Sequence, residues 1–245
     1  MRQFAIFTEG LTEQVFVRQI LLKVVDNSKL KFVCMKLAAS GNETPVPWDY
    51  SAPEPELYFL ILDCGGDGKV LSAIGEREKR LIDKGYEKII GIRDMYSKEY
   101  CERSPKIIDS TVIASLIRNW NRTIREMANA DRITFHISIM EVEAWFLAMY
   151  NLFHKIDSRL SLDFIETNLG FNLQTDDPEK KFYKPSNQVK DIMRLCGRRY
   201  TKKRAEVEAI TSRMEVQDFT NATENCRCSS FGFFYSDIAS CTLIV

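Results

Sequence analysis

The chain has 245 residues, which suits one large domain or one domain with a smaller appendage. Hydrophobic residues make up 45% of it and charged residues 28%, proportions that exclude the disordered and fibrous classes of protein. Lys plus Arg and Asp plus Glu both number 34, so the net charge indicates neither a nucleic-acid partner nor a membrane surface. Any basic surface must therefore be local.

The cysteines and the apolar runs together favour a cytoplasmic protein. Seven cysteines are scattered along the chain, no secretory signal is visible, and no apolar run approaches the roughly 20 residues of a membrane-spanning helix. Reduced thiols in the cytoplasm are the simplest interpretation. Cys226 and Cys228 form the only close pair, and because His136 and His154 are far away in sequence we predict no zinc site.

The first seventeen residues predict a strand, a turn and a helix. The apolar run 4–7 stops at Glu9 and Gly10, and a helix is expected over 12–25 with Thr12 as its cap. A buried strand would thus deliver one carboxylate to its C-terminal end. In open α/β sheets this edge is where ligands bind.

The next part of the chain repeats the alternation of strand and helix. Further apolar runs predict strands over 31–36, 57–62, 88–92 and 132–139. Helices are expected over 70–84, over 110–127 and from Glu141 onward, and a loop over 39–56. Apolar strands separated by helices predict an α/β fold, with a mostly parallel central sheet flanked by helices over 1–150. Residues 151–245 are expected to form a mainly helical C-terminal extension.

Acidic residues follow several of these strands. Glu9, Asp63 and Asp94 each close a predicted strand, and Glu141 and Glu143 come directly after another. The ends of parallel strands meet at one edge of a sheet, so these acids should converge. Converging carboxylates repel each other unless a cation neutralises them. A hard ion such as Mg²⁺ or Mn²⁺ suits oxygen ligands, and the sequence therefore predicts a metal site.

Ordinary alternatives remain open for these acids. Asp63 and Asp67 flank two glycines, where a turn or capping role is favoured. Glu9 and Asp94 are favoured as site residues because each closes a very apolar strand.

Glu141 and Glu143 start a helix, where acids also favour the helix dipole. Because they are two residues apart they should point in different directions, so we expect one of them to face the site, with Glu141 slightly preferred.

A glycine-rich loop follows the third predicted strand. Gly65, Gly66, Gly68 and Lys69 resemble a phosphate cradle at the start of a helix, although the Walker spacing and the G-x-G-x-x-G pattern are both absent. A plain tight turn is the favoured alternative. A nucleotide-binding module that uses this loop is a third functional hypothesis. Lys69 and Arg93 are also candidates to stabilise charge that develops on a phosphate, while Arg93 has the alternative of neutralising Asp94.

Two segments carry a resemblance to a known domain. The segment 8–21 (TEGLTEQVFVRQIL), with Asp94 after a later apolar strand, resembles the TOPRIM domain of topoisomerases, primases, OLD-family nucleases and small RNA-maturing nucleases. The segment 141–148 (EVEAWFLA) resembles a signature of small bacterial TOPRIM-like proteins, which are related to OLD-family nuclease domains and are often encoded in mobile or anti-phage defence loci. The resemblance covers about 1–150, with a vaguer match near 228–231.

This resemblance implies a divalent-metal-dependent nuclease that cleaves DNA or RNA and works beside an ATPase partner. Glu9 would be a metal ligand or general base and Asp94 a metal ligand, with Glu141 and Glu143 completing the site. The family pattern also expects an acid at the position of Tyr96.

Glu99, Glu141 or Glu143 would have to replace that missing acid. Otherwise the domain is a degenerate module that binds nucleic acid or a partner protein without cleavage. A homo-oligomer is left open.

The C-terminal part holds a basic run and an aromatic cluster. The candidate phosphate contacts of the run are Arg198, Arg199, Lys202, Lys203 and Arg204. A solvated helix face, interleaved with acids at 206 and 208, is the slightly favoured alternative. The aromatic cluster 231–235 is expected to seal the core or to form a partner surface. Trp145 and His136 are expected in the core.

Overall fold

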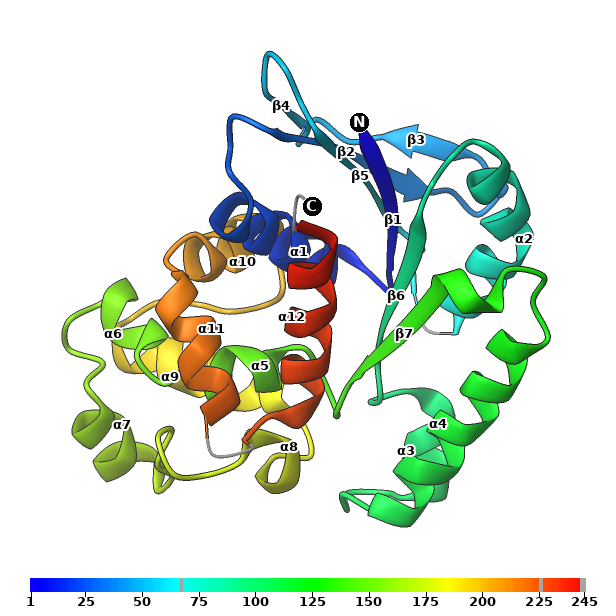
Figure 1. Ribbon diagram of the computed structural model, residues 1–245. Coiled ribbons are helices and arrows are strands. Elements are labelled where there is room, and N and C mark those ends of the chain that lie inside the picture. The colour runs from blue at the N-terminus through cyan, green and yellow to red at the C-terminus, as the bar shows by residue number, and fades with distance from the viewer. Residues whose placement is uncertain (67, 225–226, 243–245) are drawn as a thin grey trace.

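The computed structural model describes residues 1–66, 68–224 and 227–242, and Asp67 and Cys226 lie outside them. The described residues form a seven-stranded sheet in the order β3-β2-β5-β1-β6-β7, with β4 beside β2 (Figure 1). The strands are β1 (Arg2–Thr8), β2 (Leu30–Leu37), β3 (Glu43–Pro45), β4 (Tyr50–Ser51), β5 (Leu57–Asp63), β6 (Lys88–Asp94) and β7 (Ile133–Ser138).

The five long strands run parallel to one another. β1 lies between β5 and β6, and Thr8 near its end pairs with Asp63 on one side and Ile92 on the other. The strand ends that carry the acids therefore share one edge, as the apolar pattern predicted. The predicted α/β fold, with a mostly parallel sheet flanked by helices, is confirmed.

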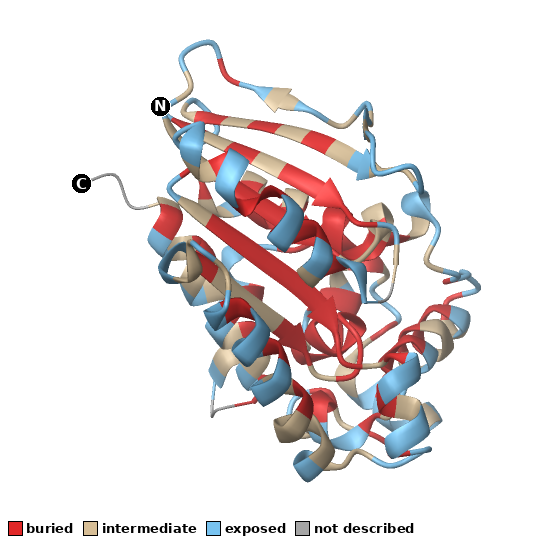
Figure 2. Ribbon diagram, turned by 90° about the vertical axis from the view of Figure 1, so that its right-hand side faces the viewer, coloured by how far each residue is buried: buried red, intermediate tan, exposed pale blue. Residues whose placement is uncertain are grey.

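Helices cover both faces of this sheet. Phe4 and Ile6 pack in a core with α1 (Leu11–Val24) and the C-terminal helices, whereas Ala5 and Phe7 pack in a second core with α2 (Lys69–Asp83). The central strands are buried along their length, and the helices have buried inner and exposed outer sides (Figure 2). Burial on both faces explains why these strands read as continuous apolar runs.

The described part of the C-terminal extension consists of helices joined by loops, and these helices share the α1 core. The remaining helices are α3 (Lys98–Arg103), α4 (Ser110–Arg125), η1 (Ala130–Arg132), α5 (Glu143–Ala148), α6 (Leu152–Ile156), α7 (Leu162–Leu169), α8 (Pro178–Lys181), α9 (Pro185–Leu195), α10 (Arg204–Thr211), α11 (Val216–Thr223) and α12 (Ser229–Thr242). None of the helices in the described segments combines the length and the hydropathy that crossing a bilayer needs.

An aromatic cluster joins the extension to the sheet domain. Trp145 stacks on Phe234 with 5.2 Å between ring centroids, and Phe16 lies 5.6 Å from Trp145. Phe231 and Phe234 are fully buried, while Phe233 between them is exposed. The aromatic segment of α12 therefore seals the core with two rings and offers a third to the surface.

Several local predictions were wrong. Helix α1 begins at Leu11 with Gly10 as its N-cap, and Thr12 is buried in its first turn. The expected loop 39–56 contains β3 and β4, two short strands that pair antiparallel with β2. Helix α3 was missed because six residues with charges on several sides carry little periodicity. These elements depend on neighbours rather than on their own pattern.

Candidate functional site

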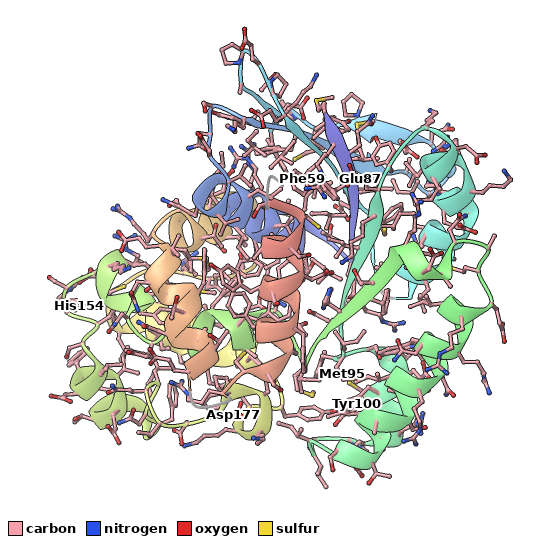
Figure 3. The ribbon with its side chains drawn as sticks, viewed as in Figure 1. Phe59, Glu87, Met95, Tyr100, His154 and Asp177 are labelled. Atoms are coloured by element: carbon pink, nitrogen blue, oxygen red, sulfur yellow. The ribbon has the colours of Figure 1, made fainter. Side chains whose placement is uncertain are left out.

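Glu9 and Asp94 meet at the carboxyl edge of the sheet. The backbone amide of Asp94 donates to Glu9 Oε2 at 3.2 Å, and Arg93 Nε lies 4.0 Å from the same oxygen. Glu9 keeps 15% of its side chain exposed. Figure 3 labels Met95, the residue after Asp94, where the chain leaves β6 for α3.

Asp94 is buried and held by donors from the end of β7 and from the connection that follows it. Its Oδ1 accepts from the Val142 amide at 3.0 Å and from the Ser138 hydroxyl. Burial raises the pKa of Asp94 well above its ordinary value, and the carboxylates of Glu13 and Glu143 raise it further. A buried carboxyl beside other carboxyls takes up a proton or a cation.

Glu13 is a member of the site that sequence reasoning missed. It lies in the first turn of α1, where its Oε2 accepts from the Gly10 amide at 2.9 Å. Burial, together with the charge of Glu9, raises the pKa of Glu13 to about 8. Its spacing was the available signal, because a Glu at the third helical position reaches back toward the residue before the helix.

Glu141 and Glu143 bind the same ammonium group. Lys202 Nζ donates to Glu141 Oε1 at 3.0 Å and to Glu143 Oε2 at 3.1 Å. The expectation that they diverge was wrong, because α5 begins only at Glu143 and helical geometry does not relate the two side chains. Met140, just before them, has a φ of +69°. Such backbone strain in a non-glycine residue concentrates at functional sites.

Each of these two glutamates also has a structural partner. The amide and hydroxyl of Ser186, at the start of α9, donate to Glu141 at 2.8 and 3.0 Å. The Tyr200 hydroxyl donates to Glu143 Oε1 at 2.7 Å. Burial raises the pKa of Glu143, whereas Lys202 opposes that rise.

The basic run divides into one inward and several outward residues. Lys202 points into the acidic site from a strained backbone with φ +60°, and 37% of its side chain is exposed. Burial lowers its pKa, but Glu143 and Glu141 raise it above the ordinary value, so the ammonium stays charged. The run lies in the loop between α9 and α10 up to Lys203, and only Arg204 is helical, so most of the run does not form a helix face. Its exposed members are Arg198, Arg199, Lys203 and Arg204.

Arg204 has partners of its own at the start of α10. Its Nε donates to Glu208 Oε1 at 3.1 Å, and its guanidinium lies 4.5 Å from the centre of the Trp48 ring. The structure therefore does not bring Arg204 into the acidic site.

The glycine loop uses two of its amides internally. The Gly65 amide donates to Asp63 Oδ1 at 2.8 Å, and the Gly66 amide donates to the Glu9 carbonyl at 2.8 Å. Asp63 therefore has the turn role that the sequence favoured. Gly68 is the N-cap of α2, with a φ of +77°.

Lys69, the first residue of α2, is exposed and lines a hollow beside Leu37 and Glu76. In the described part of the chain, none of the five acids Glu9, Glu13, Asp94, Glu141 and Glu143 lines that hollow. A place for Lys69 in the acidic site therefore stays a prediction.

Tyr96 occupies the position where the resemblance expects an acid. Its ring lies edge-on to Tyr183 with 5.5 Å between centroids, and Lys184 Nζ lies 5.1 Å from its ring centre. Glu99 does not replace the acid, because it is exposed on α3 and lies 3.9 Å from Arg103. Two aromatic rings and a lysine therefore lie together at position 96, whose backbone amide donates to the carbonyl of Met140, just before Glu141.

The site has more acidic than basic side chains. Its carboxylate oxygens are the kind of ligand that a hard cation prefers. Its carboxyl groups are those of Glu9, Glu13, Asp94, Glu141 and Glu143. Within the described residues, Lys202 and Arg93 are the cations that form ion pairs with them. Burial raises the pKa of three of these acids, so bringing them together costs free energy unless a cation or protons are bound.

The arrangement is not that of a formed metal centre. In 1–66, 68–224 and 227–242 no three His, Cys, Asp or Glu side chains have the geometry of a metal site. Lys202 lies between the two glutamates where an ion would otherwise neutralise them. Comparisons of the chain with family models, with curated proteins and with solved structures found no match.

Proposed function

We propose that this protein hydrolyses phosphodiester bonds in nucleic acid with the help of Mg²⁺ or Mn²⁺. One observation carries the proposal: five carboxyl groups from β1, α1, β6 and the connection after β7 gather at one edge of the sheet. Burial and neighbouring carboxylates raise the pKa of three of them, Glu13, Asp94 and Glu143, so negative charge at this edge is only partly compensated by protein cations. Sites with such clustered, perturbed carboxyls are candidates for metal-assisted chemistry.

Each residue of the site has a role that its position supports. A bound ion would polarise a phosphate and activate water. Glu9, whose side chain keeps 15% of its surface exposed, and Asp94 are the residues that would hold the ion. Lys202 places a charge where phosphate oxygens become more negative during attack. Glu13, with a pKa of about 8, retains a proton at neutral pH and exchanges it readily.

The substrate and partners follow from charge and from the resemblance. The exposed Arg198, Arg199 and Lys203 flank the loop that delivers Lys202 and would contact phosphates of DNA or RNA. An ATPase partner, a role in anti-phage defence and a cytoplasmic location rest on the resemblance and on the cysteine pattern, and they belong to this proposal.

Metal binding by calorimetry is the direct test. Wild-type protein should bind Mn²⁺ and Mg²⁺, and Glu9→Gln and Asp94→Asn should each lower the affinity at least about tenfold by removing one charged ligand. Glu126→Gln, a matched change on an exposed glutamate, should bind as the wild type does. A folded wild type that binds neither ion would contradict the proposal.

A second function is favoured by Tyr96. A tyrosine in place of an acid, packed against Tyr183, suits a domain that binds nucleic acid or a partner protein without cleaving it. This alternative predicts binding of an oligonucleotide by the wild type with no cleavage in Mn²⁺. Cleavage that is lost in Asp94→Asn would exclude it.

A further inference from the structure

The outer edge of the sheet forms a groove. β7 is the last strand and pairs only with β6 among the described residues. Helix α4 packs against one of its faces and α12 against the other (Figure 1). The groove between them has a volume of about 550 Å³ and is lined by Ile117 of α4, by β7 and by Phe233 of α12. Phe233 is 72% exposed, so a large apolar side chain stands at the rim.

The backbone of β7 offers hydrogen-bonding groups to this groove. The carbonyl of Ser138 accepts from the Met95 amide, so the backbone of this residue points toward β6. Backbone groups alternate between the two sides of a strand, and those of Phe135 and Ile137 therefore point outward. No other described strand pairs with them. Free edges are usually blunted by Lys, Pro or a bulge, but Ile133–Ser138 contains no Lys or Pro.

Arginines border the groove along α4. Arg118 and Arg125 are helical neighbours of Asn121, which lines the groove, and Arg122 is in turn a helical neighbour of Arg118. Arg132 stands just before β7. All four arginines are exposed. In the part of the chain that the structure describes, no acidic side chain lies within ion-pair distance of them, and α4 itself contains no acid.

We propose that this groove binds an extended, acidic segment of a partner protein as an added strand beside β7. The main chain of the segment pairs with the outward backbone groups of Phe135 and Ile137. Its central apolar side chains pack against Ile117 and Phe233. Acidic residues at its flanks pair with the arginines, which supply the specificity for charge.

A second copy of this chain is a poorer occupant. Two β7 strands paired antiparallel are related by a two-fold axis perpendicular to the sheet. This axis places both α4 helices side by side on one face, so that arginines of like charge come together and repel. Nucleic acid is also a poorer occupant, because an apolar groove offers phosphates no partner beyond the arginines at the rim.

Fluorescence anisotropy with a labelled peptide tests the proposal on the full chain. The probe is Glu-Glu-Val-Thr-Val-Thr-Val-Glu-Glu, and it should bind saturably. A peptide with Lys in place of each Glu should bind at least about tenfold more weakly. The acidic peptide methylated on alternate backbone nitrogens should lose affinity to a similar degree, because it cannot donate to a strand edge.

Variants of exposed residues locate the binding surface. Phe233→Asp and the double change Arg118→Glu with Arg122→Glu should each weaken binding at least about tenfold, while the unfolding midpoint remains that of the wild type. Arg213→Glu, an exposed arginine beyond α10, is the matched control and should bind normally.

Four results with the peptides and variants would overturn the proposal. These are no saturable binding of the acidic peptide, equal binding of the lysine peptide, equal binding of the methylated peptide, or affinity unchanged in both groove variants. An oligonucleotide that binds in place of the peptide and requires the same arginines would assign the surface to nucleic acid. A dimer in sedimentation that Phe233→Asp abolishes would assign it to a second copy.

Discussion

Two buried carboxylate sites in this molecule differ in the charges around them. One is the acidic site around Asp94, and the other is that of Asp237 on α12. Asp237 on α12 accepts from Thr134 at 2.6 Å and from His136 at 2.8 Å, and it pairs with Lys88. Burial would raise its pKa, but hydrogen bonds from His136, Lys88 and Thr134 lower it to about 2. This carboxylate ties α12 to β6 and β7, and it satisfies the histidine that the sequence placed in the core.

Asp94 has the opposite surroundings. Burial and the like charges of Glu13 and Glu143 raise its pKa, although it also accepts hydrogen bonds from Ser138 and Val142. Both aspartates are largely buried, so burial does not distinguish them. The sign of the neighbouring charges does, and it separates a carboxylate that stabilises the fold from one that is poised to bind a cation.

The largest expected effect is on cleavage by Asp94→Asn. Loss of this charge should lower Mn²⁺-dependent cleavage of a labelled oligonucleotide about 10³-fold, as removal of a charged group that acts in the transition state does. The free energy of unfolding should stay the same or increase, because one of several repelling carboxylates is gone. Full activity of the variant would contradict the claim that Asp94, unlike Asp237, acts in cation binding.

Asp237→Ala should have the reverse effect. Removal of this carboxylate leaves Lys88 and His136 without their partner and should lower the free energy of unfolding by about 3 kcal/mol, measured by urea denaturation. Ser236→Ala, an exposed neighbour on the same helix, is the control and should change it little. Metal binding should persist in folded Asp237→Ala protein, and its loss would show that the two groups are coupled.

The two groups should also respond to pH with opposite sign. The pKa of Glu13 rises from 4.5 to about 8 in the folded state, so its contribution to stability is complete below pH 4.5 and is lost as the pH rises toward 8. The pKa of Asp237 falls from 3.8 to about 2. Its contribution is complete above pH 3.8 and is lost as the pH falls toward 2, by about 2 kcal/mol.

Urea denaturation across this pH range measures both contributions. Glu13→Gln should reduce the decline of the free energy of unfolding above pH 4.5, because glutamine does not titrate. An unchanged decline would mean that Glu13 is not the group with the raised pKa.

Tyr96→Asp should produce the smallest effect. An added carboxylate beside Asp94 restores the acid that the TOPRIM pattern expects, and it should raise Mn²⁺ affinity about tenfold, or about 1.4 kcal/mol. Calorimetry measures this gain, with Tyr96→Asn as the uncharged control. Equal affinity in both variants would indicate that position 96 does not face the ion.

The strands were predictable because their signal is local. The run ending at Glu9 and the run ending at Asp94 are apolar throughout, and a strand buried on both faces requires that composition. The structure extends both strands by a few residues without changing their order. The short strands β3 and β4 gave no such signal, because their pairing with β2 rather than their composition stabilises them.

By itself, the amino-acid sequence determined the parallel sheet and the gathering of Glu9 and Asp94 at one edge, because both follow from short apolar runs and the acids that end them. Only the tertiary structure decided that Lys202, 61 positions after Glu141, reaches into the same cluster. It also decided that Glu13 turns back toward Gly10 and lies close enough to Glu9 for the two charges to interact. Such contacts depend on how helices and loops pack around the sheet, and packing between distant segments leaves no periodic trace in the sequence.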